Sequence, residues 1–191
     1  MKYLGIFIDQ NLTWKHHIDH VAFKTSRYVG LLSILRHLVP THKLIAYTIY
    51  RSLISPHLSY GLLAWGQACM SHLEKLLKLQ KRVLRFIYFY DFKQHAVPLF
   101  IEAGVLPLKF YFFRITANLM YDVRHKIAPT RIQKQFQDIS NIHPHYPRSS
   151  ASNNFYTQSS RLSIKLNSLS RTGSTIWNGI SLTLRSLKKT S

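Results

Sequence analysis

The first apolar segment of the chain is short, and the pattern that follows it has a different period. Residues 3–8 ("YLGIFI") form a compact apolar run that predicts a buried β-strand. From Asn11 onward, apolar side chains recur at alternating steps of four and three, which is typical of one face of an α-helix. The pattern therefore predicts one long helix, capped at its start by Thr13 and ended by Pro40. The members of this stripe are Trp14, Ile18, Val21, Thr25, Tyr28, Leu32, Leu35 and Val39.

Two further helices are predicted after this one. The segment 41–66, with Thr41 as its cap, is apolar on nearly all sides, as expected of the most buried helix in a bundle, and Pro56 should kink or break it. Ser71 and Glu74 have the spacing of a capping box, which predicts the start of a third helix. Short turns separate the three helices, so we expect antiparallel neighbours. The apolar face of the third helix comprises Leu73, Leu76, Leu77, Val83, Leu84 and Ile87.

The signal for regular structure weakens toward the C-terminus. A short helix over Ala96–Ala103, ended by Gly104, and a helix from Pro107 to about Lys126 are predicted. After Pro129, serine, asparagine and proline are frequent, which predicts a linker with short elements and one ordered patch around Trp177. The fold class is therefore mainly α: an antiparallel helical bundle with one short N-terminal β-strand and an irregular C-terminal region.

We expect four parts along the chain. Its 191 residues are long enough to bury a core, and a hydrophobic content of 46% argues against disorder. The parts are a strand at 1–10, a three-helix bundle at 11–92, further helices packed on the bundle at 93–128, and a basic linker with a small element around Trp177 at 129–191.

The charge balance is strongly basic. There are 26 lysines and arginines against 7 aspartates and glutamates, a formal net charge of +19 with histidine neutral. Such a chain repels itself unless it meets a polyanion. Nucleic acid is the leading partner, because a basic surface releases counterions from closely spaced phosphates. An anionic membrane surface and an acidic protein are the alternatives.

The expected cellular compartment of the protein follows from its number of cysteines and from the length of its apolar runs. The single cysteine, Cys69, cannot form an internal disulfide. No run approaches the ~20 apolar residues of a membrane helix, and the N-terminal run is too short for a secretory signal. We therefore expect an intracellular protein, nuclear or cytoplasmic, that is not secreted and does not associate with a membrane.

One cationic face occurs within the third predicted helix. Four of its members recur at steps of three, four and three opposite the apolar face, and Lys81 borders them. Such a face is ordinarily the solvated side of an amphipathic helix. Only one acid, Glu74, shares this helix, so contact with phosphates is favoured over mere solvation. The residues of this face, named here the basic row, are Lys75, Lys78, Lys81, Arg82 and Arg85. The aromatic residues 88–90 that follow either stack on bases or pack in the core.

The chain carries no enzyme signature of its own. The closest acids along the sequence, Asp9 and Asp19, are ten residues apart, so there is no local carboxylate pair for metal-assisted catalysis. His16 and His20 share a helical spacing but fall on the polar side of the first helix, and we interpret them as surface histidines rather than metal ligands. His17, next to buried Ile18, is the one that can pack partly inside and hydrogen-bond a neighbouring loop. No cofactor and no metal are expected.

Five blocks of the chain, in order, carry a family resemblance. They are "YLGIFIDQNLTWKHHI" (3–18), "SLISPHLSYGLLAWG" (52–66), "LEKLLKLQKRVLRFI" (73–87), "HAVPLFIEAGVLPL" (95–108) and "GSTIWNGIS" (173–181). Together they resemble the C-terminal portion of non-LTR (LINE) retrotransposon reverse transcriptases of the jockey/CR1-like kind. In that family the Y-L-G strand ends the palm and the following helices form the thumb. The resemblance implies that the strand's partners, and the catalytic aspartates of the palm, lie in an upstream part that this sequence does not contain.

The resemblance also implies a function. The chain is expected to be a fragment of an RNA-directed DNA polymerase that grips template and primer without sequence preference and is not an enzyme on its own. Its expected partners are the backbone of an RNA–DNA or DNA duplex and the upstream palm of a polymerase. Two alternatives stay open: a helical interaction module that docks on a separate polypeptide through its open strand edge, and the product of a decayed reading frame with no selected role.

Overall fold

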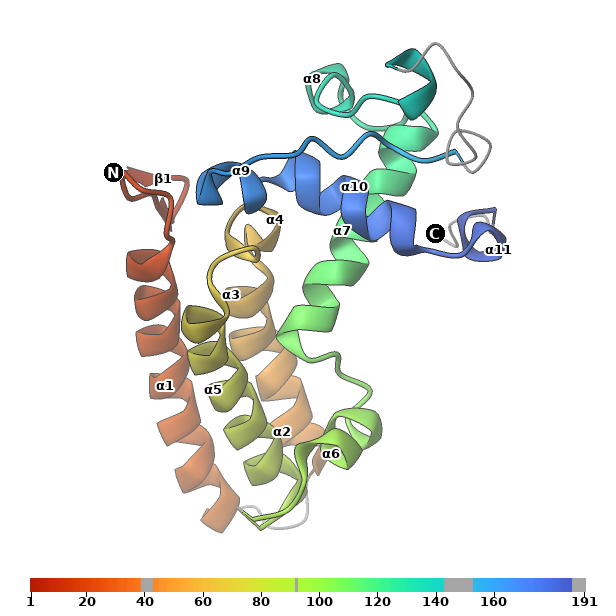
Figure 1. Ribbon diagram of the computed structural model, residues 1–191. Helices are drawn as coiled ribbons and strands as arrows, with labels where there is room; N and C mark the ends of the chain where they lie inside the picture. Colours follow the sequence, from red (N-terminus) through yellow and green to blue (C-terminus); the bar gives the residue numbers. More distant parts are fainter. Residues whose placement is uncertain (39–42, 92, 143–152, 187–191) are drawn as a thin grey trace. The chain divides into compact units, whose positions relative to one another are not determined.

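The structure is a computed structural model that describes residues 1–38, 43–91, 93–142 and 153–186. The chain divides into two compact units, Met1–Phe112 and Phe113–Ser191. Helices dominate both units (Figure 1), and the described residues contain one small sheet of two strands. The prediction of a mainly α fold with a short N-terminal β-structure is therefore confirmed. None of the described helices is long and apolar enough to cross a membrane.

The N-terminal apolar run folds back on itself. β1 (Lys2–Tyr3) and β2 (Ile6–Phe7) pair antiparallel across a turn at Leu4 and Gly5. Gly5 has a φ of 81°, a conformation that glycine adopts without steric cost. The prediction of one continuous buried strand over residues 3–8 was wrong, because the glycine permits a hairpin and leaves Leu4 71% exposed at its tip.

The hairpin is held against the helices of the first unit by the segment Tyr60–Gly61. The hydroxyl of Tyr60 donates to the carbonyl of Leu4 at 2.7 Å, while the indole N–H of Trp65 donates to the carbonyl of Tyr60 at 2.9 Å. Gly61 has a φ of 62° and lies so close to Ile6 that a Cβ atom there would be 2.5 Å from Ile6 Cδ1. A side chain at this position would therefore require Ile6 to shift and would add the strain of a positive φ.

The first long helix, α1 (Lys15–Leu38), begins after an aspartate cap. Asp9 accepts hydrogen bonds from the backbone and hydroxyl of Thr13, at 2.8 and 2.7 Å, and from the backbone of Trp14 at 2.9 Å. The prediction of Thr13 as the cap residue was wrong, because Trp14 holds that position and its carbonyl accepts from Ile18 N–H; the hydroxyl of Thr13 accepts from Lys15 N–H at 3.4 Å. Trp14, at a φ of 62°, lies before the helix, so the predicted stripe loses its first member. Of the members whose burial the structure describes, Ile18, Val21, Thr25 and Leu32 are buried, whereas the predicted member Val39 lies outside the described residues.

The second predicted helix is interrupted, as the proline in it predicts. A proline lacks the N–H of a helical residue, and its ring collides with the carbonyl four residues earlier in an α-helix. Here a π turn directly precedes Pro56, with Ser55 N–H donating to the carbonyl of Tyr50, and this wider turn accommodates the ring. The resulting segments are α2 (Lys43–Ile49), the π-helical η1 (Tyr50–Ile54), α3 (Ser55–Ser59) and α4 (Leu62–Trp65).

Burial within this run is uneven. Leu44 is 80% exposed and Ile45 50% exposed, whereas Trp65 is fully buried. The expectation of a helix buried along its whole length was therefore wrong for its N-terminal part. The helix end predicted at Pro40 and the cap predicted at Thr41 lie outside the described residues.

The third predicted helix is α5 (Met70–Tyr88). Its apolar face is buried as predicted, with Leu77 half-buried at its margin. The capping box was wrong: the carbonyl of Cys69 already accepts from the N–H groups of His72 and Leu73, so the helix starts before Ser71. Ser71 instead donates its hydroxyl to the sulfur of Cys69 at 3.3 Å.

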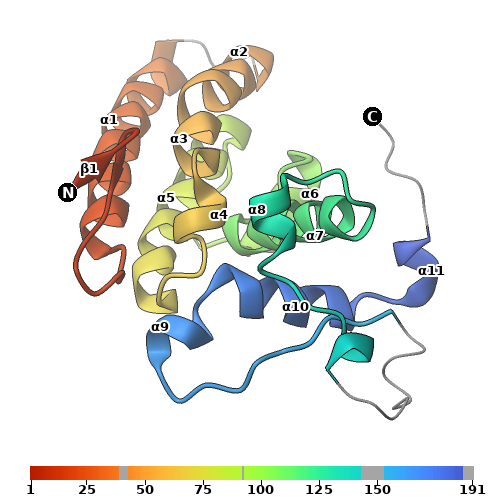
Figure 2. The ribbon, with the colours of Figure 1, turned by 90° about the horizontal axis from the view of Figure 1, so that it is seen from above.

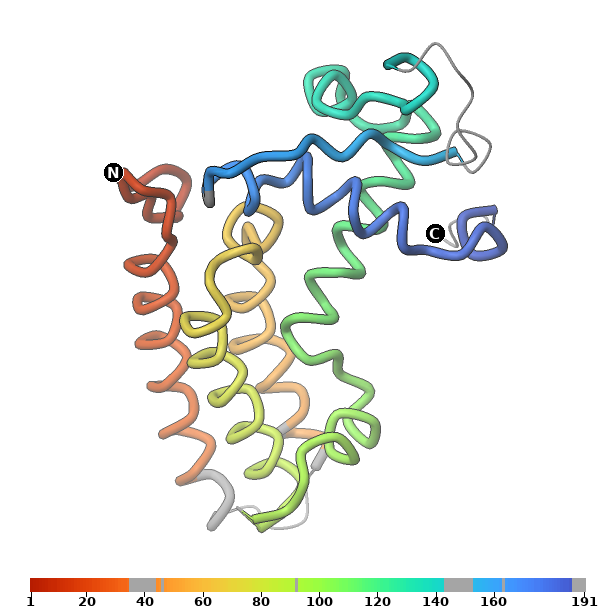
Figure 3. Tube along the Cα trace, in the orientation of Figure 1, coloured from red at the N-terminus to blue at the C-terminus, as the bar shows by residue number. Residues whose placement is uncertain are grey.

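These elements form the bundle of the first unit. α1, α5 and the run α2–α4 lie side by side (Figures 1 and 2), and α2–α4 runs opposite to α1 and α5 (Figure 3). The predicted antiparallel order of successive helices is confirmed. α6 (Ala96–Glu102) follows and ends as predicted, with Gly104 at a φ of 59°.

A buried amide joins three segments of this unit. Gln80 of α5 is 3% exposed. Its nitrogen donates to the hydroxyl of Tyr50 and to the carbonyl of Leu106, each at 3.0 Å, and its oxygen accepts from the N–H of Leu108 at 3.1 Å. Leu108 begins α7 (Leu108–Arg124), so one side chain ties η1, α5 and the start of α7 together.

The second unit has its own core around Trp177, where the sequence predicts an ordered patch. The core residues are Met120, Val123, Ala128, Phe136, Phe155 and Trp177. Gly173 allows this packing, because a Cβ atom there would lie 2.7 Å from the sulfur of Met120. The helices after α7 are α8 (Thr130–Gln133), the 3-10 turn η2 (Ile139–Asn141), α9 (Ser163–Leu166), α10 (Leu169–Gly179) and α11 (Leu182–Arg185).

Histidines lie where the hairpin meets α1. His17 is 3% exposed and accepts a hydrogen bond from Phe7 N–H at Nδ1, 3.4 Å away, which confirms the predicted inward packing. His16 and His20 flank the ring of Phe7 at 4.9 and 4.8 Å. Burial lowers the pKa of His17, and the neighbouring His20 lowers it further. Burial also lowers the pKa of His20, with Lys24 adding to the effect.

We predict that replacing Gln80 with leucine lowers the free energy of unfolding by about 3 kcal/mol. Leucine keeps the volume but leaves the buried hydroxyl of Tyr50 and two backbone groups without partners. Urea denaturation followed by circular dichroism measures the change. The exposed Gln10→Leu is the matched control and should shift stability by less than about 0.5 kcal/mol. Equal losses in the two variants would contradict the role of this amide.

We also predict that the free energy of unfolding falls as the pH drops below about 6.5. A histidine with a depressed folded-state pKa stays neutral in the folded chain while the unfolded chain takes up a proton. Stability is therefore full above the unfolded pKa and is lost as the pH falls toward the folded pKa. His17→Gln keeps an acceptor for Phe7 but cannot titrate, so it should lose less stability between about pH 7 and pH 5. Denaturation midpoints measure this, with the exposed His95→Gln as the control. The same pH slope in His17→Gln and wild type would refute the assignment.

Candidate nucleic-acid interface

The basic row lies on the outer side of α5. Because the apolar face of the helix turns into the bundle, the opposite side is left to solvent. Lys75, Lys78 and Arg82 are exposed, while Lys81 and Arg85 are half-buried. Cations three and four positions apart are neighbours on a helix surface, so the exposed three form one continuous face.

Lys75 is paired with an acid of another helix. Its Nζ lies 2.6 Å from Oδ1 of Asp19 in α1, and both side chains are nearly half exposed. The hydrogen bond from Lys75 lowers the pKa of Asp19. Sequence reasoning missed this partner, because 56 positions separate the two residues. An exposed ion pair of this kind contributes at most about 1 kcal/mol, so a phosphate can compete for Lys75.

The two arginines of the row have different surroundings. Arg82 lies over the ring of Phe86, with its guanidinium carbon 5.5 Å from the ring centre, and a stacked guanidinium keeps its in-plane N–H groups for other acceptors. Arg85 donates to the carbonyl of Gln94 at 3.0 Å and so secures the turn after α5. The structure therefore gives Arg85 a structural contact that the sequence pattern does not reveal.

The aromatic residues after the row are mostly engaged. Tyr90 donates its hydroxyl to Glu102 at 2.9 Å, and this hydrogen bond raises the pKa of Tyr90. Phe89 ends α5 at a φ of 57° and is 39% exposed. Tyr88 is half-buried. The sequence left two interpretations for these residues, stacking on bases and packing in the core, and neither one describes all three rings.

Sequence reasoning missed a second cationic surface on the first unit. Lys24, Arg27, Tyr28 and Leu31 of α1 line an open cleft with His57 of α3. The rings of Tyr28 and His57 stack with centres 5.5 Å apart at 16°. Burial lowers the pKa of His57, and the charge of Lys24 lowers it further. The spacing of the four α1 residues along one helix face is the signal that could have found this cleft.

Metal-ligating side chains do not gather in the part of the chain that the structure describes: no three His, Cys, Asp or Glu residues there are placed to hold an ion. Exposed cationic surfaces of this kind are suited to contacts with anions.

Similarity to known proteins is found over part of the chain. A stretch of 90 residues, 45% of the chain, is 34% identical to a probable RNA-directed DNA polymerase from transposon X-element of Drosophila melanogaster. A stretch of 91 residues, also 45% of the chain, is 42% identical to the RNA-directed DNA polymerase from mobile element jockey of the same species. The jockey polymerase of Drosophila funebris is 33% identical over 90 residues, 45% of the chain.

Each match spans 10% of the length of the relative. No protein-family model matches the chain, and no solved structure matches it. The predicted resemblance to jockey-like non-LTR retrotransposon reverse transcriptases is thus confirmed over about 45% of this sequence.

Proposed function

We propose that this chain is a part of a jockey-like retrotransposon RNA-directed DNA polymerase that holds the template–primer duplex by its sugar–phosphate backbone. The outer face of α5 carries the proposal, because Lys75, Lys78 and Arg82 are exposed together on it. Contacts to phosphates position a protein on a duplex but carry no sequence information. The binding is therefore without sequence preference, as in a polymerase thumb.

The packing of α5 supports this role. The helix is fixed by its buried apolar face and by Gln80, so the cations on its outer side share one rigid support. A row held in this way can contact several phosphates at once without first ordering its backbone. The net charge of +19 adds long-range attraction for the same partner.

We assign no catalysis to this part of the polymerase alone. A polymerase metal centre needs carboxylates gathered on two cations, whereas several acids here already serve local structure. These are Asp9 in the α1 cap, Asp19 with Lys75, Glu102 with Tyr90 and Asp138 with Arg124. The catalytic aspartates are proposed to belong to the palm of the polymerase. Primer extension by the purified chain would contradict this.

The predicted signature of the basic row is a salt-dependent affinity for an RNA–DNA duplex. Because Arg85 is hydrogen-bonded to Gln94, four cations of the basic row remain for contacts with phosphates. The logarithm of the affinity should therefore fall with the logarithm of the salt concentration at a slope near −3.5. The double variant Lys78→Gln/Arg82→Gln removes two contacts and should bring the slope to about −2. Fluorescence anisotropy of a labelled duplex across a sodium chloride series measures both.

The matched control for this test is Lys126→Gln/Arg131→Gln, which removes the same two charges from exposed positions of the second unit. It should leave the slope close to that of the wild type. A salt-insensitive wild-type affinity, or equal slopes in the two double variants, would refute the proposal for α5.

A second candidate function is docking on another polypeptide through the hairpin β1–β2. Tyr3 is 59% exposed and Leu4 is 71% exposed, on a sheet that has no third strand among the described residues. An open strand edge with apolar neighbours is a template for pairing with a further strand. The polypeptide proposed as partner is the palm of the same polymerase.

We predict that Tyr3→Ser/Leu4→Ser weakens co-purification of the chain with a separately expressed palm of a jockey-like polymerase, because it removes apolar area from the interface. The double variant Phe23→Ser/Ile34→Ser removes exposed apolar side chains from α1 instead and should have no effect. Equal losses in both variants, or no binding by the wild type, would exclude docking through the hairpin.

A further inference from the structure

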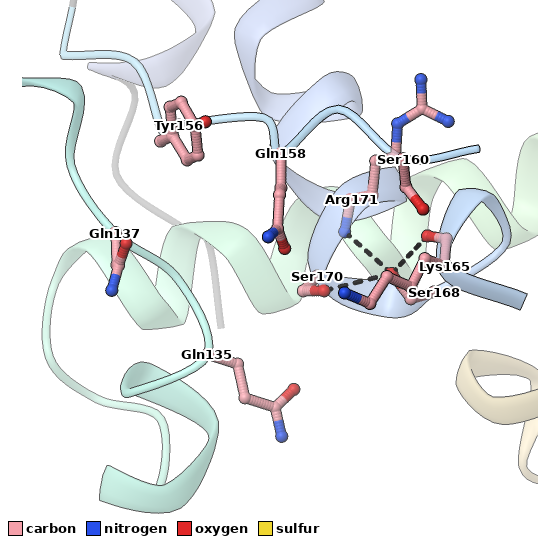
Figure 4. A pocket seen from close by; sticks show the side chains of 9 residues that line it. All are labelled: Gln135, Gln137, Tyr156, Gln158, Ser160, Lys165, Ser168, Ser170 and Arg171. Carbon is pink, nitrogen blue, oxygen red and sulfur yellow. Dashed lines mark hydrogen bonds between the residues drawn. The ribbon is translucent and has the colours of Figure 1, made fainter. Parts of the chain in front are cut away.

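The second unit contains an open cleft of about 390 Å³ between the chain segment 156–160, the residues after α8 and the start of α10 (Figure 4). Its volume is within the range of small-ligand sites. The lining is polar: glutamine amides, serine hydroxyls, one tyrosine and two cations. Apolar side chains do not line it, so the ligand it fits is itself polar.

The charges of the cleft favour an anion. Lys165 and Arg171 line it, and no acidic residue does. Arg171 Nε is buried and has no hydrogen-bond partner among the described residues. The acid nearest in sequence, Asp138, is paired with Arg124. A bound anion would therefore meet uncompensated positive charge.

The start of α10 adds donors to the same cleft. Ser168 caps the helix by accepting from Arg171 N–H at 3.5 Å, and its hydroxyl lies 3.1 Å from that of Ser170 (Figure 4). This cap leaves the N–H group of Ser170, a residue that lines the cleft, without an intrahelical partner. Together with the Lys165 ammonium, these groups suit the oxygens of a phosphate.

The remainder of the lining suits a nucleobase. Tyr156 is 36% exposed, and its backbone is fixed by a 2.7 Å hydrogen bond from its N–H to the carbonyl of Gln137. The amide of Gln158 extends toward Ser170 (Figure 4). An amide both donates and accepts, so it can pair with the edge of a base, while a tyrosine ring offers a face on which a base stacks.

We propose that this cleft binds one nucleotide of a single-stranded nucleic acid, with the phosphate at Lys165 and the start of α10 and the base on Tyr156. A base paired within a duplex is stacked and cannot enter a recessed site, whereas an unpaired base can turn out of the strand. The cleft therefore selects a different form of nucleic acid from the basic row, and the proposal does not depend on that row.

The test uses the full chain and a fluorescently labelled oligothymidylate single strand. Tyr156→Ala should weaken binding about tenfold, whereas Tyr156→Phe, which keeps the stacking face, should stay within about twofold of the wild type. Lys165→Gln should weaken binding about threefold and make the salt slope shallower by about 0.7. The exposed Lys134→Gln, outside the cleft, is the matched control and should keep the wild-type slope. Circular dichroism and thermal unfolding establish that each variant is folded.

Three results would overturn the proposal. The first is an equal loss in Tyr156→Ala and Tyr156→Phe, which removes stacking as the cause. The second is an equal effect of Lys165→Gln and Lys134→Gln, which makes the binding a matter of net charge alone. The third is a combination of two findings: inorganic phosphate saturates the cleft in a titration monitored by amide chemical shifts, and Tyr156→Ala does not change the affinity for the single strand. The ligand would then be a free phosphate.

The proposals for the cleft and for α5 fail in different ways. A chain that binds the duplex with the expected salt slope but does not bind the single strand overturns the cleft alone. A chain that binds the single strand with the expected loss in Tyr156→Ala, but binds the duplex without salt dependence, overturns the role of α5 alone.

Discussion

The buried amide of Gln80 sets the rotation of α5 about its own axis. Its three hydrogen bonds reach the hydroxyl of Tyr50, the carbonyl of Leu106 and the N–H of Leu108. Each of these groups would cost about 1–3 kcal/mol if it were buried without a partner, so the helix is restricted to the orientation that points Gln80 inward. In that orientation Lys78, two positions before, turns outward. The polar contact in the core and the cationic surface are therefore two consequences of one helix register.

Several acids of the chain have structural partners, and one of them, Asp19, partly offsets the charge of the basic row through Lys75. Asp9 caps α1, and its hydrogen bonds outweigh the effect of burial so that its pKa lies below the usual value. Asp138 is paired with Arg124, whose guanidinium also donates to Asn153 and lies over Phe155. Whatever their partners, the seven acids leave the chain with a net charge of +19. A polyanion is the partner that relieves such self-repulsion.

The features that the sequence predicts well depend on local chemistry. The break before Pro56, the helix end at Gly104 and the buried face of α5 each follow from the steric properties or the periodicity of nearby residues. The missed features depend on distant partners. Nothing near Gln80 in the sequence indicates that a polar side chain will be satisfied inside the bundle, and nothing near Lys75 indicates Asp19. The basic row was found from its spacing, but the contact of Arg85 with Gln94 depends on the conformation of a turn.

The two proposed surfaces differ in shape, and in our proposal this difference determines which form of nucleic acid each one binds. On α5 the cations lie on the exposed face of a helix. The sugar–phosphate backbone of a duplex can approach this face while its bases remain stacked. In the second unit the charges lie in a cleft that is also lined by a tyrosine and by glutamine amides. A nucleotide whose phosphate is bound there would place its base against these side chains. Positive charge attracts both forms, because every nucleotide carries a phosphate. Discrimination must therefore come from the aromatic and amide groups, and these line the recess beside Lys165 and Arg171.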